Sequence, residues 1–543
     1  MPRVLAFLSA LAVCSLAASA RLAADTYPRQ PDVDAVHYEF TLELRDTSPD
    51  ITASATVEMR FVTDRVTSFE LDLASAGNGK GMTVTAVTSP GDAATFTHQA
   101  GRLRIVMATP ARANEHRVFT IAYHGVPANG LRLLSNKHGE WSAFSENWPN
   151  RAREWLPMID HPYDKATSEF IVTAPARYQV VANGLLQEVI DLGDGRRVTH
   201  WKQGVPIASW LNAIGVEQFY VRHAGAVKGV ELSTWVAHQD KDIGPVYFEG
   251  PARQALEFFS ERVGPYAYEK LANVAAAGIS GGTEHASAIF YGERGVRGVP
   301  AFGLVSHEVA HQWFGNAVTE RDWDDVWLSE GFATYFTHLC EEHYLGRAVM
   351  VAGLKRDVTT ILAAEKASPD TPVVHRNLSD MSKVLNRFVY QKGGWVLHML
   401  RGRIGTETFW TGIREYYRRY RNMNVSTDEF RQVMERASGT DLREFFTQWL
   451  NRSGVPKIDG TWQYDAATKQ ITVTLTQTIA GEPFRLPLEI GIVAASGAVP
   501  RIEKAELTGG SGTFTFTADT EPAAVALDPN TWLLFEAGAF TKR

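Results

Sequence analysis

The chain has 543 residues, of which 45% are hydrophobic and 21% are charged, and its formal net charge is −7. This length exceeds one hydrophobic core and predicts several domains, and the composition is that of a globular protein. The negative charge argues against nucleic acid as a partner, because no basic excess is available to neutralise phosphates.

The N-terminus predicts a signal peptide over residues 1–20. Arg3 precedes an uncharged apolar run at residues 4–17, and small residues at 18–20 offer a cleavage site. The run is short for a membrane span and no later stretch resembles one. We therefore expect an exported protein, periplasmic or secreted, with no stable membrane insertion. A lipid anchor on Cys14 is the alternative, which the bulky Val13 before it disfavours.

Residues 21–224 are expected to form an N-terminal, mostly antiparallel β domain. Apolar and polar residues alternate at 37–44 and again at 56–62, and turn residues such as those at 77–79 and 193–195 separate the runs. Alternation with a period of two indicates strands that bury one face.

The period changes in residues 225–452, where apolar residues recur at helical spacing. The expected helices cover residues 252–263, 304–314, 326–344, 354–365, 427–436 and 441–450. Strand-like alternation returns in residues 453–543, for example at Ile471, Val473 and Leu475, and predicts a small β-sandwich.

A metal-binding pattern lies in the helix expected at residues 304–314. His307 and His311 are four residues apart, so both imidazoles lie on one helical face and can bind one metal ion. Glu308 lies between them, in reach of a water molecule on which it can act as general base. A surface helix that merely carries two histidines is the alternative.

A third ligand is available on the next expected helix. Glu330 stands among Trp327, Leu328 and Phe332, and a carboxylate in such apolar surroundings is costly unless it is paired or binds a metal. Three protein ligands and one open position are what a catalytic zinc site needs.

These residues carry a family resemblance. Residues 307–315 (His-Glu-Val-Ala-His-Gln-Trp-Phe-Gly) and 327–333 (Trp-Leu-Ser-Glu-Gly-Phe-Ala) resemble the M1 family of zinc aminopeptidases, which usually has Asn in place of Ser329. The resemblance implies a multidomain α+β protein with a thermolysin-like α/β catalytic domain at residues 225–452. It also implies one Zn²⁺ per chain, with the ligands His307, His311 and Glu330.

A second match lies upstream, where residues 281–285 (Gly-Gly-Thr-Glu-His) resemble the family's Gly-Ala-Met-Glu-Asn strand. The resemblance implies that Gly281, Gly282 and Thr283 bind the substrate and that Glu284 holds its free α-amino group. A solvated loop acid is the alternative for Glu284. Thr283 and His285 depart from the pattern and leave the shape and polarity of the first side-chain pocket open.

A third match is downstream, where residues 389–394 (Val-Tyr-Gln-Lys-Gly-Gly) resemble the segment that bears the family's catalytic tyrosine. The resemblance implies that Tyr390 donates a hydrogen bond to the oxyanion that develops during hydrolysis. A core tyrosine is the alternative.

A weaker match concerns residues 157–162, which stand where the family has Pro-Cys-Phe-Asp-Glu-Pro. Just before it the family often has a Gln or Glu that also holds the substrate amine. Trp148 falls near that place here, so Glu146, two residues earlier, is the candidate, and an acid at the rim of the site is the alternative.

The expected activity is removal of the N-terminal residue from peptides with a free N-terminus. The alternatives are an endopeptidase with the same zinc chemistry and an inactive binding module; an epoxide hydrolase finds no support in the sequence. Asp322, Asp324 and Asp325 could hold a histidine ligand, or could simply form a turn. Many relatives continue into a large helical C-terminal domain, so we expect a more open site here.

Overall fold

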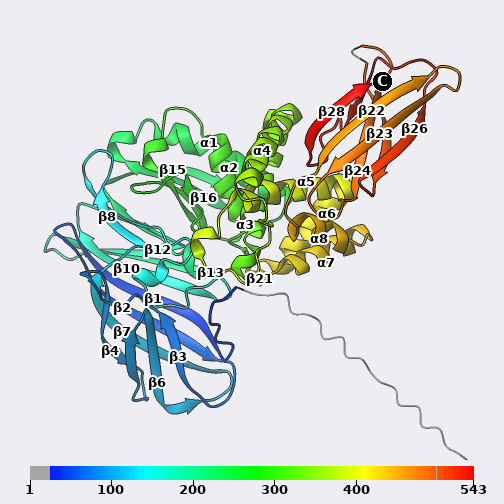
Figure 1. Cartoon of the computed structure of the whole chain (residues 1–543). Coiled ribbons are helices and arrows are strands. Elements are labelled where there is room, and N and C mark those ends of the chain that lie inside the picture. The colour runs from blue at the N-terminus through cyan, green and yellow to red at the C-terminus, as the bar shows by residue number, and fades with distance from the viewer. Residues whose placement is uncertain (1–24, 497) are drawn as a thin grey trace, which may run out of the picture.

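The computed structural model describes residues 25–496 and 498–543, so the segment predicted as a signal peptide lies outside the described residues. The N-terminal strands and the C-terminal strands lie on opposite sides of a central group of helices (Figure 1). The expected α+β class is confirmed, with a β-rich N-terminal part, an α/β middle and C-terminal β-sheets. In the part of the chain that the structure describes, each helix is too short or too polar to traverse a lipid bilayer.

The N-terminal part is built on a seven-stranded sheet in the order β12-β13-β10-β1-β2-β7-β4, in which only β1 and β10 are parallel. Its strands are β1 (Val33–Arg45), β2 (Ser48–Phe61), β4 (Gly81–Thr88), β7 (Glu115–Val126), β10 (Lys165–Pro175), β12 (Leu185–Asp191) and β13 (Arg196–Ala208). Alternation decides which face of β1 is buried, because Tyr38, Phe40, Leu42 and Leu44 are all at most 2% exposed.

Two smaller antiparallel sheets complete this part, in the orders β3-β6-β5 and β11-β14-β9-β8. Their strands are β3 (Val66–Asp72), β5 (Thr95–Gln99), β6 (Arg102–Ala111), β8 (Leu131–Ser135), β9 (Trp141–Ser145), β11 (Gln179–Ala182) and β14 (Ile214–Glu217). Strands β8 and β9 matter for the site, because the chain that leaves β9 reaches the central cavity.

The middle of the chain opens with a five-stranded mixed sheet in the order β15-β16-β17-β19-β18; α1 lies between β16 and β17, and the other α-helices follow the sheet. Its strands are β15 (Phe219–Val227), β16 (Val230–Ala237), β17 (Lys270–Ala276), β18 (Gly282–Thr283) and β19 (Ala288–Gly292), and a two-stranded pair joins β20 (Val318–Glu320) to β21 (Met423–Val425). The helices are α1 (Gly244–Arg262), α2 (Phe302–His311), α3 (Trp327–Leu345), α4 (Arg347–Ala367), α5 (Gly393–Ile404), α6 (Thr406–Tyr420), α7 (Thr427–Ser438) and α8 (Arg443–Leu450).

Helix α2 ends at His311, three residues earlier than its apolar spacing indicates. The backbone N–H of Asn316 bonds to the carbonyl of His311, and Gly315 has a φ of +106°, so residues 312–315 form a tight turn. A Cβ on Gly315 would lie 2.1 Å from Oγ of Ser329, and therefore only glycine fits at this position.

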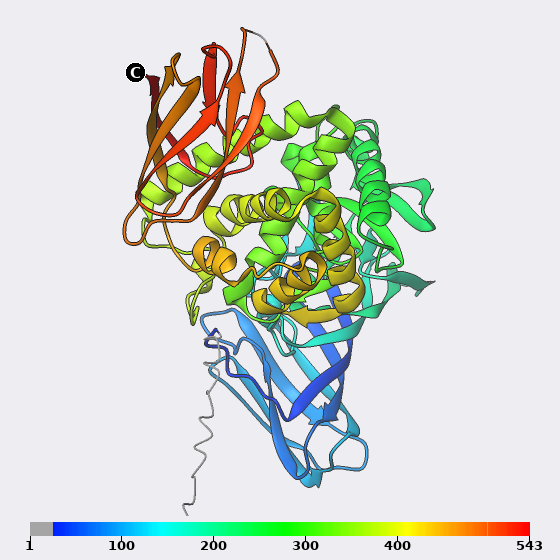
Figure 2. The ribbon, with the colours of Figure 1, turned by 90° about the vertical axis from the view of Figure 1, so that its right-hand side faces the viewer.

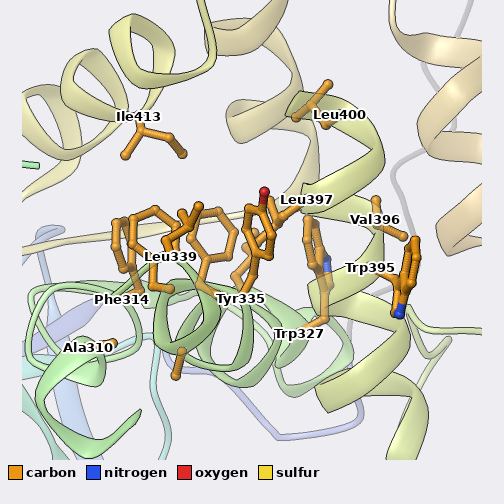
Figure 3. Packing of buried hydrophobic residues seen from close by; sticks show 14 of the residues in the cluster. Ala310, Phe314, Trp327, Tyr335, Leu339, Trp395, Val396, Leu397, Leu400 and Ile413 are labelled. Carbon is orange, nitrogen blue, oxygen red and sulfur yellow. The ribbon is translucent and has the colours of Figure 1, made fainter. Parts of the chain in front are cut away.

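Helix α3 lies unusually close to the start of α5. A Cβ on Gly331 would lie 2.9 Å from the carbonyl carbon of Gly393, so the two backbones meet where neither residue has a side chain. Farther along the same contact, Trp327 and Tyr335 extend from α3 into the buried space beside α5 (Figure 3), and the ring of Tyr335 packs on that of His398 in α5 with centroids 5.5 Å apart. This packing fixes the distance between the elements that carry Glu330 and Tyr390.

The C-terminal strands form two sheets, in the orders β26-β23-β22-β28 and β25-β24-β27, and lie against the helical middle on the side away from the N-terminal strands (Figure 2). The strands are β22 (Lys457–Asp465), β23 (Gln470–Thr478), β24 (Leu486–Val493), β25 (Arg501–Leu507), β26 (Ser511–Thr517), β27 (Ala524–Leu527) and β28 (Glu536–Lys542).

Candidate metal centre and substrate pocket

Three side chains converge between α2 and α3. Nε2 of His311 lies 3.2 Å from Nε2 of His307 and 3.2 Å from Oε2 of Glu330, and Nε2 of His307 lies 3.5 Å from the same oxygen. Oε2 of Glu330 is buried and has no hydrogen-bond donor within the described residues. Two imidazoles and an otherwise unpartnered carboxylate oxygen form a donor set that suits zinc.

The electrostatics of this centre favour a positive charge where the three side chains meet. Burial opposes protonation of His311, but Glu284 and Glu330 outweigh it and raise the pKa of His311 to about 10. Burial also opposes ionisation of Glu330, but the imidazoles of His311 and His307 outweigh it and hold the pKa of Glu330 well below its usual range. The residues therefore fit a bound cation.

The ring of His311 is oriented by groups that sequence reasoning did not find. Its Nδ1 lies 3.2 Å from the carbonyl oxygen of Phe314 and 3.1 Å from Oγ of Ser329. Such partners of a ligand imidazole fix its ring and tautomer. Ser329 thus takes part in the site although it departs from the family's usual asparagine.

The three aspartates suggested for that role have other partners. Asp322 pairs with Arg29, Asp324 accepts bonds from the backbone of residues 377 and 378, and Asp325 accepts bonds from Thr427. Within the described residues, none of them hydrogen-bonds a histidine of the centre. They lie in the turn between α2 and α3 and fasten this turn to neighbouring segments.

Glu308 lies beside the centre and against the chain of β18. A Cβ on Gly282 would lie 2.4 Å from Cδ of Glu308, so the glycine is what leaves room for this carboxylate. Glu308 is buried, and burial together with the nearby charge of Glu284 raises its pKa well above the usual value. A carboxyl group with a raised pKa can take up a proton and return it.

Glu284 directly follows β18 and is buried against the same helix that carries the histidines. Its carbonyl oxygen accepts bonds from Nε2 of Gln312 at 3.0 Å and from Nδ2 of Asn316 at 2.6 Å. Its carboxylate Oε1 accepts a bond of 2.9 Å from the indole N–H of Trp148. Burial raises the pKa of Glu284 in spite of this bond.

The other residues of the upstream motif differ in their exposure to the site. Gly282 and Thr283 line the cavity beside Glu284, whereas the carbonyl of Gly281 is bonded to the backbone of β19. His285 turns away and packs against Phe290, with ring centroids 5.0 Å apart. Thr283 and His285 both depart from the family pattern, but only Thr283 lines the cavity.

Tyr390 approaches the centre from a π-helical turn, η7 (Phe388–Lys392). Its hydroxyl donates a bond of 2.8 Å to Oε1 of Glu330, and its ring stacks on that of His307 at 6.2 Å. Burial, reinforced by the charge of Glu330, raises the pKa of Tyr390 far above the usual value, so the hydroxyl stays protonated. Single π-helical turns inside helices often mark functional positions.

Glu146 lies at the same cavity, but its carboxylate is occupied. Oε2 accepts a bond of 2.8 Å from Nη2 of Arg132 and another from Nη1 of Arg151. Burial nevertheless raises the pKa of Glu146. Sequence reasoning did not single out the two arginines, although Arg151 stands close to Trp148 in the segment compared with the family.

The metal trio, Glu308, Glu284, Tyr390 and Glu146 meet in one cavity of about 380 Å³. It is lined by Arg132, Glu146, Trp148, Arg151, Gly278, Ile279, Ser280, Gly282, Thr283, Glu284, His307, Glu308, His311, Glu330, Leu385 and Tyr390. The structure thus brings every predicted site residue except Gly281 to a single space.

Two histidines one helical turn apart, with a carboxylate from the following helix, place the chain among proteins with a His-Glu-x-x-His metal site. The chain belongs to peptidase family M1: residues 34–211 match the model of the peptidase M1 N-terminal domain, and residues 251–449 match that of the peptidase family M1 domain.

Among curated relatives, glutamyl aminopeptidase of Bos taurus is 26% identical over 335 residues, which are 58% of this chain and 35% of the relative. Tricorn protease-interacting factor F2 of Thermoplasma acidophilum is 25% identical over 343 residues, 61% of this chain and 43% of the relative. The chain thus matches less than half the length of either relative.

Two solved structures share the fold. Legionella pneumophila aminopeptidase A in complex with aspartic acid has a TM-score of 0.79 at 18% identity and covers 94% of this chain and 60% of its own. The M1 zinc metallopeptidase of Deinococcus radiodurans has a TM-score of 0.67 at 24% identity and covers 79% of this chain and 94% of its own.

Proposed function

We propose that this protein is a zinc-dependent aminopeptidase that hydrolyses the first peptide bond of peptides with a free N-terminus. One observation carries the proposal: the convergent trio His307, His311 and Glu330 shares a cavity with Glu284, a buried carboxylate suited to an ammonium group. Membership of peptidase family M1 supports it.

His307, His311 and Glu330 would hold one Zn²⁺, which when bound supplies Lewis-acid polarisation of the scissile carbonyl and activates water. Glu308 takes the proton of the attacking water as general base and passes it to the leaving amine. The protonated hydroxyl of Tyr390 donates a hydrogen bond to the carbonyl oxygen as negative charge develops on it.

Glu284 supports an exopeptidase over an endopeptidase. Its carboxylate binds the substrate's α-ammonium at a fixed distance from the metal trio, which leaves room for one residue between the amine and the bond that breaks. Residues 282 and 283 form β18, the edge strand of its sheet, and lead directly to this anchor, so the outer edge of β18 can bind the substrate's main chain. An inactive binding module would not need Glu308 and Tyr390 at the same centre.

The proposal is tested with fluorogenic amino-acid amides and their N-acetylated counterparts, each assayed with and without a chelator. We expect cleavage of free amides, loss of activity on chelation with recovery on adding Zn²⁺, and no cleavage of acetylated amides. Equal cleavage of both sets supports the endopeptidase instead, and no cleavage of either supports the binding module. The panel should include Glu and Asp amides, because the relative from Bos taurus is named glutamyl aminopeptidase and the Legionella pneumophila structure contains aspartic acid.

Export and domain division belong to the same proposal. A signal peptide over residues 1–20 would send the protein to the periplasm or the medium, and N-terminal sequencing of the mature protein tests this. The proposed domains are residues 21–224, 225–452 and 453–543; strand β15 crosses the first of these boundaries.

A further inference from the structure

The cavity has a wall whose charged groups the proposed chemistry does not use. Arg132 on β8 and Arg151 between β9 and β10 both donate to Oε2 of Glu146, and all three residues line the cavity. Two guanidinium groups share one carboxylate, which leaves one positive charge uncompensated within this cluster.

The cluster lies on the side of the cavity where the substrate's first residue must sit. Trp148, whose indole bonds to Glu284, belongs to the same short segment as Glu146 and Arg151. Arg132 in turn donates to the carbonyl of Gly278, in the loop that leads into β18. Arg151 therefore belongs to the segment whose Trp148 holds the amine anchor, and Arg132 is bonded to the loop that leads to this anchor.

The guanidinium groups retain capacity to bind a ligand. Each arginine has five N–H donors, and the bonds to Glu146 and Gly278 use only part of them. The side chains of Arg132 and Arg151 are 33% and 34% exposed, whereas that of Glu146 is 14% exposed. The less exposed carboxylate thus holds the two guanidinium groups in place and leaves their remaining N–H donors toward the cavity.

We propose that Arg132 and Arg151 select substrates whose N-terminal residue is Glu or Asp. With the α-ammonium at Glu284, the side-chain carboxylate of that residue binds the planar donor edges of the two arginines, a geometry that guanidinium groups match well. An N-terminal Lys or Arg is disfavoured by like charge. This inference rests on the proposed aminopeptidase function and adds its substrate class.

The first test needs no variant. Amides of Glu and Gln have the same shape and differ in charge, so the ratio of their kcat/KM values at neutral pH isolates the electrostatic contribution. We expect a ratio of at least about ten, equivalent to about 1.4 kcal/mol. A ratio of one or less, with cleavage of Ala and Gln amides intact, overturns the inference and leaves the proposed function standing.

Variants then assign the preference to the cluster. Arg151→Ala and Arg132→Ala should bring the Glu-to-Gln ratio toward one, and Arg196→Ala, which removes an exposed arginine from the β12–β13 hairpin, should leave it unchanged. Glu146→Gln should raise the ratio, because the arginines lose their neutralising partner. Loss of activity on all amides in a folded Glu146→Gln protein would instead make Glu146 an amine anchor and overturn the inference.

Binding provides a readout that does not depend on turnover. Calorimetry on the zinc-loaded protein should show free glutamate binding at least about tenfold more tightly than glutamine, and Arg151→Ala should abolish the difference. If no amide is cleaved but this difference is found, the proposed function fails, and the binding of acidic residues by Arg132 and Arg151 stands. If amides are cleaved and glutamate shows no advantage, the pocket fails alone.

Discussion

The bond between Trp148 and Glu284 gives the most specific prediction. The change Trp148→Phe removes the indole N–H that lies 2.9 Å from Oε1 of Glu284 and keeps an aromatic ring among its neighbours. A hydrogen bond to a charged group contributes about 1.5–3 kcal/mol. Since 1.36 kcal/mol corresponds to one pKa unit, the pKa of Glu284 should rise by about one to two units.

The sign of the effect on activity follows from the role of Glu284. The donor stabilises the ionised carboxylate, so its removal favours the protonated form, which cannot bind an ammonium group by charge. The acidic limb of kcat/KM against pH, measured with an alanine amide, should therefore move to higher pH by about one to two units. The limb of kcat should move less, because bound substrate holds Glu284 ionised.

Trp210→Phe is the matched control. Trp210 is also buried, its ring centroid lies 5.5 Å from that of Trp148, and its indole N–H has no hydrogen-bond partner among the described residues. Both variants lose similar packing, but only one loses a donor to Glu284. If the acidic limbs of the two variants coincide, the indole does not tune the anchor and the reasoning is refuted.

Four further predictions concern the centre and its support. Glu308→Gln should keep its zinc by elemental analysis and lose about 10²–10⁴-fold in kcat, as expected for a general base; substantial turnover would contradict that role. Glu330→Ala should lose the metal, and full zinc occupancy in this variant would count against its being a ligand. Glu284→Ala should reduce N-terminal trimming far more than any cleavage of blocked peptides, whereas equal losses would favour an endopeptidase. Gly331→Ala should lower the free energy of unfolding by about 1–3 kcal/mol, because the new Cβ meets the backbone of α5. Calorimetry can compare this variant with Gly250→Ala in α1, where the new Cβ meets nothing within 4 Å. Equal melting temperatures of the two variants would refute the close approach of α3 and α5.

The metal trio could be found in the sequence because its geometry is local. His307 and His311 are one turn apart, and Glu330 comes from the next helix, so helical periodicity alone brings two of the ligands together. The alternation of apolar and polar residues in β1 and β23 also predicts these strands from the sequence, because a strand with one buried face requires it. These parts of the fold and site depend on residues that are close to one another in the sequence.

The rest depends on contacts between distant segments, which no local pattern records. Trp148 and Glu284 are 136 residues apart, and their bond appears only once β9 and β18 lie at the same cavity. Helix α5 was not anticipated, since Gly393 and Gly394 at its start disfavour a helix on propensity alone. Their reason is tertiary: the missing side chains allow the close contact with Gly331.

Helix α2 connects the two halves of the proposed chemistry. The helix contains both histidines, and just beyond its end the side chains of Gln312 and Asn316 donate hydrogen bonds to the carbonyl oxygen of Glu284. The metal position and the amine anchor are therefore set from one short, buried segment rather than from two domains that can move apart. Because the separation of anchor and metal decides how many residues are removed at a time, rigidity at this point is what an exopeptidase requires. The arginine cluster, by contrast, comes from β8 and the segment after β9, so the choice of the first residue can vary without changing the residues that hold the metal.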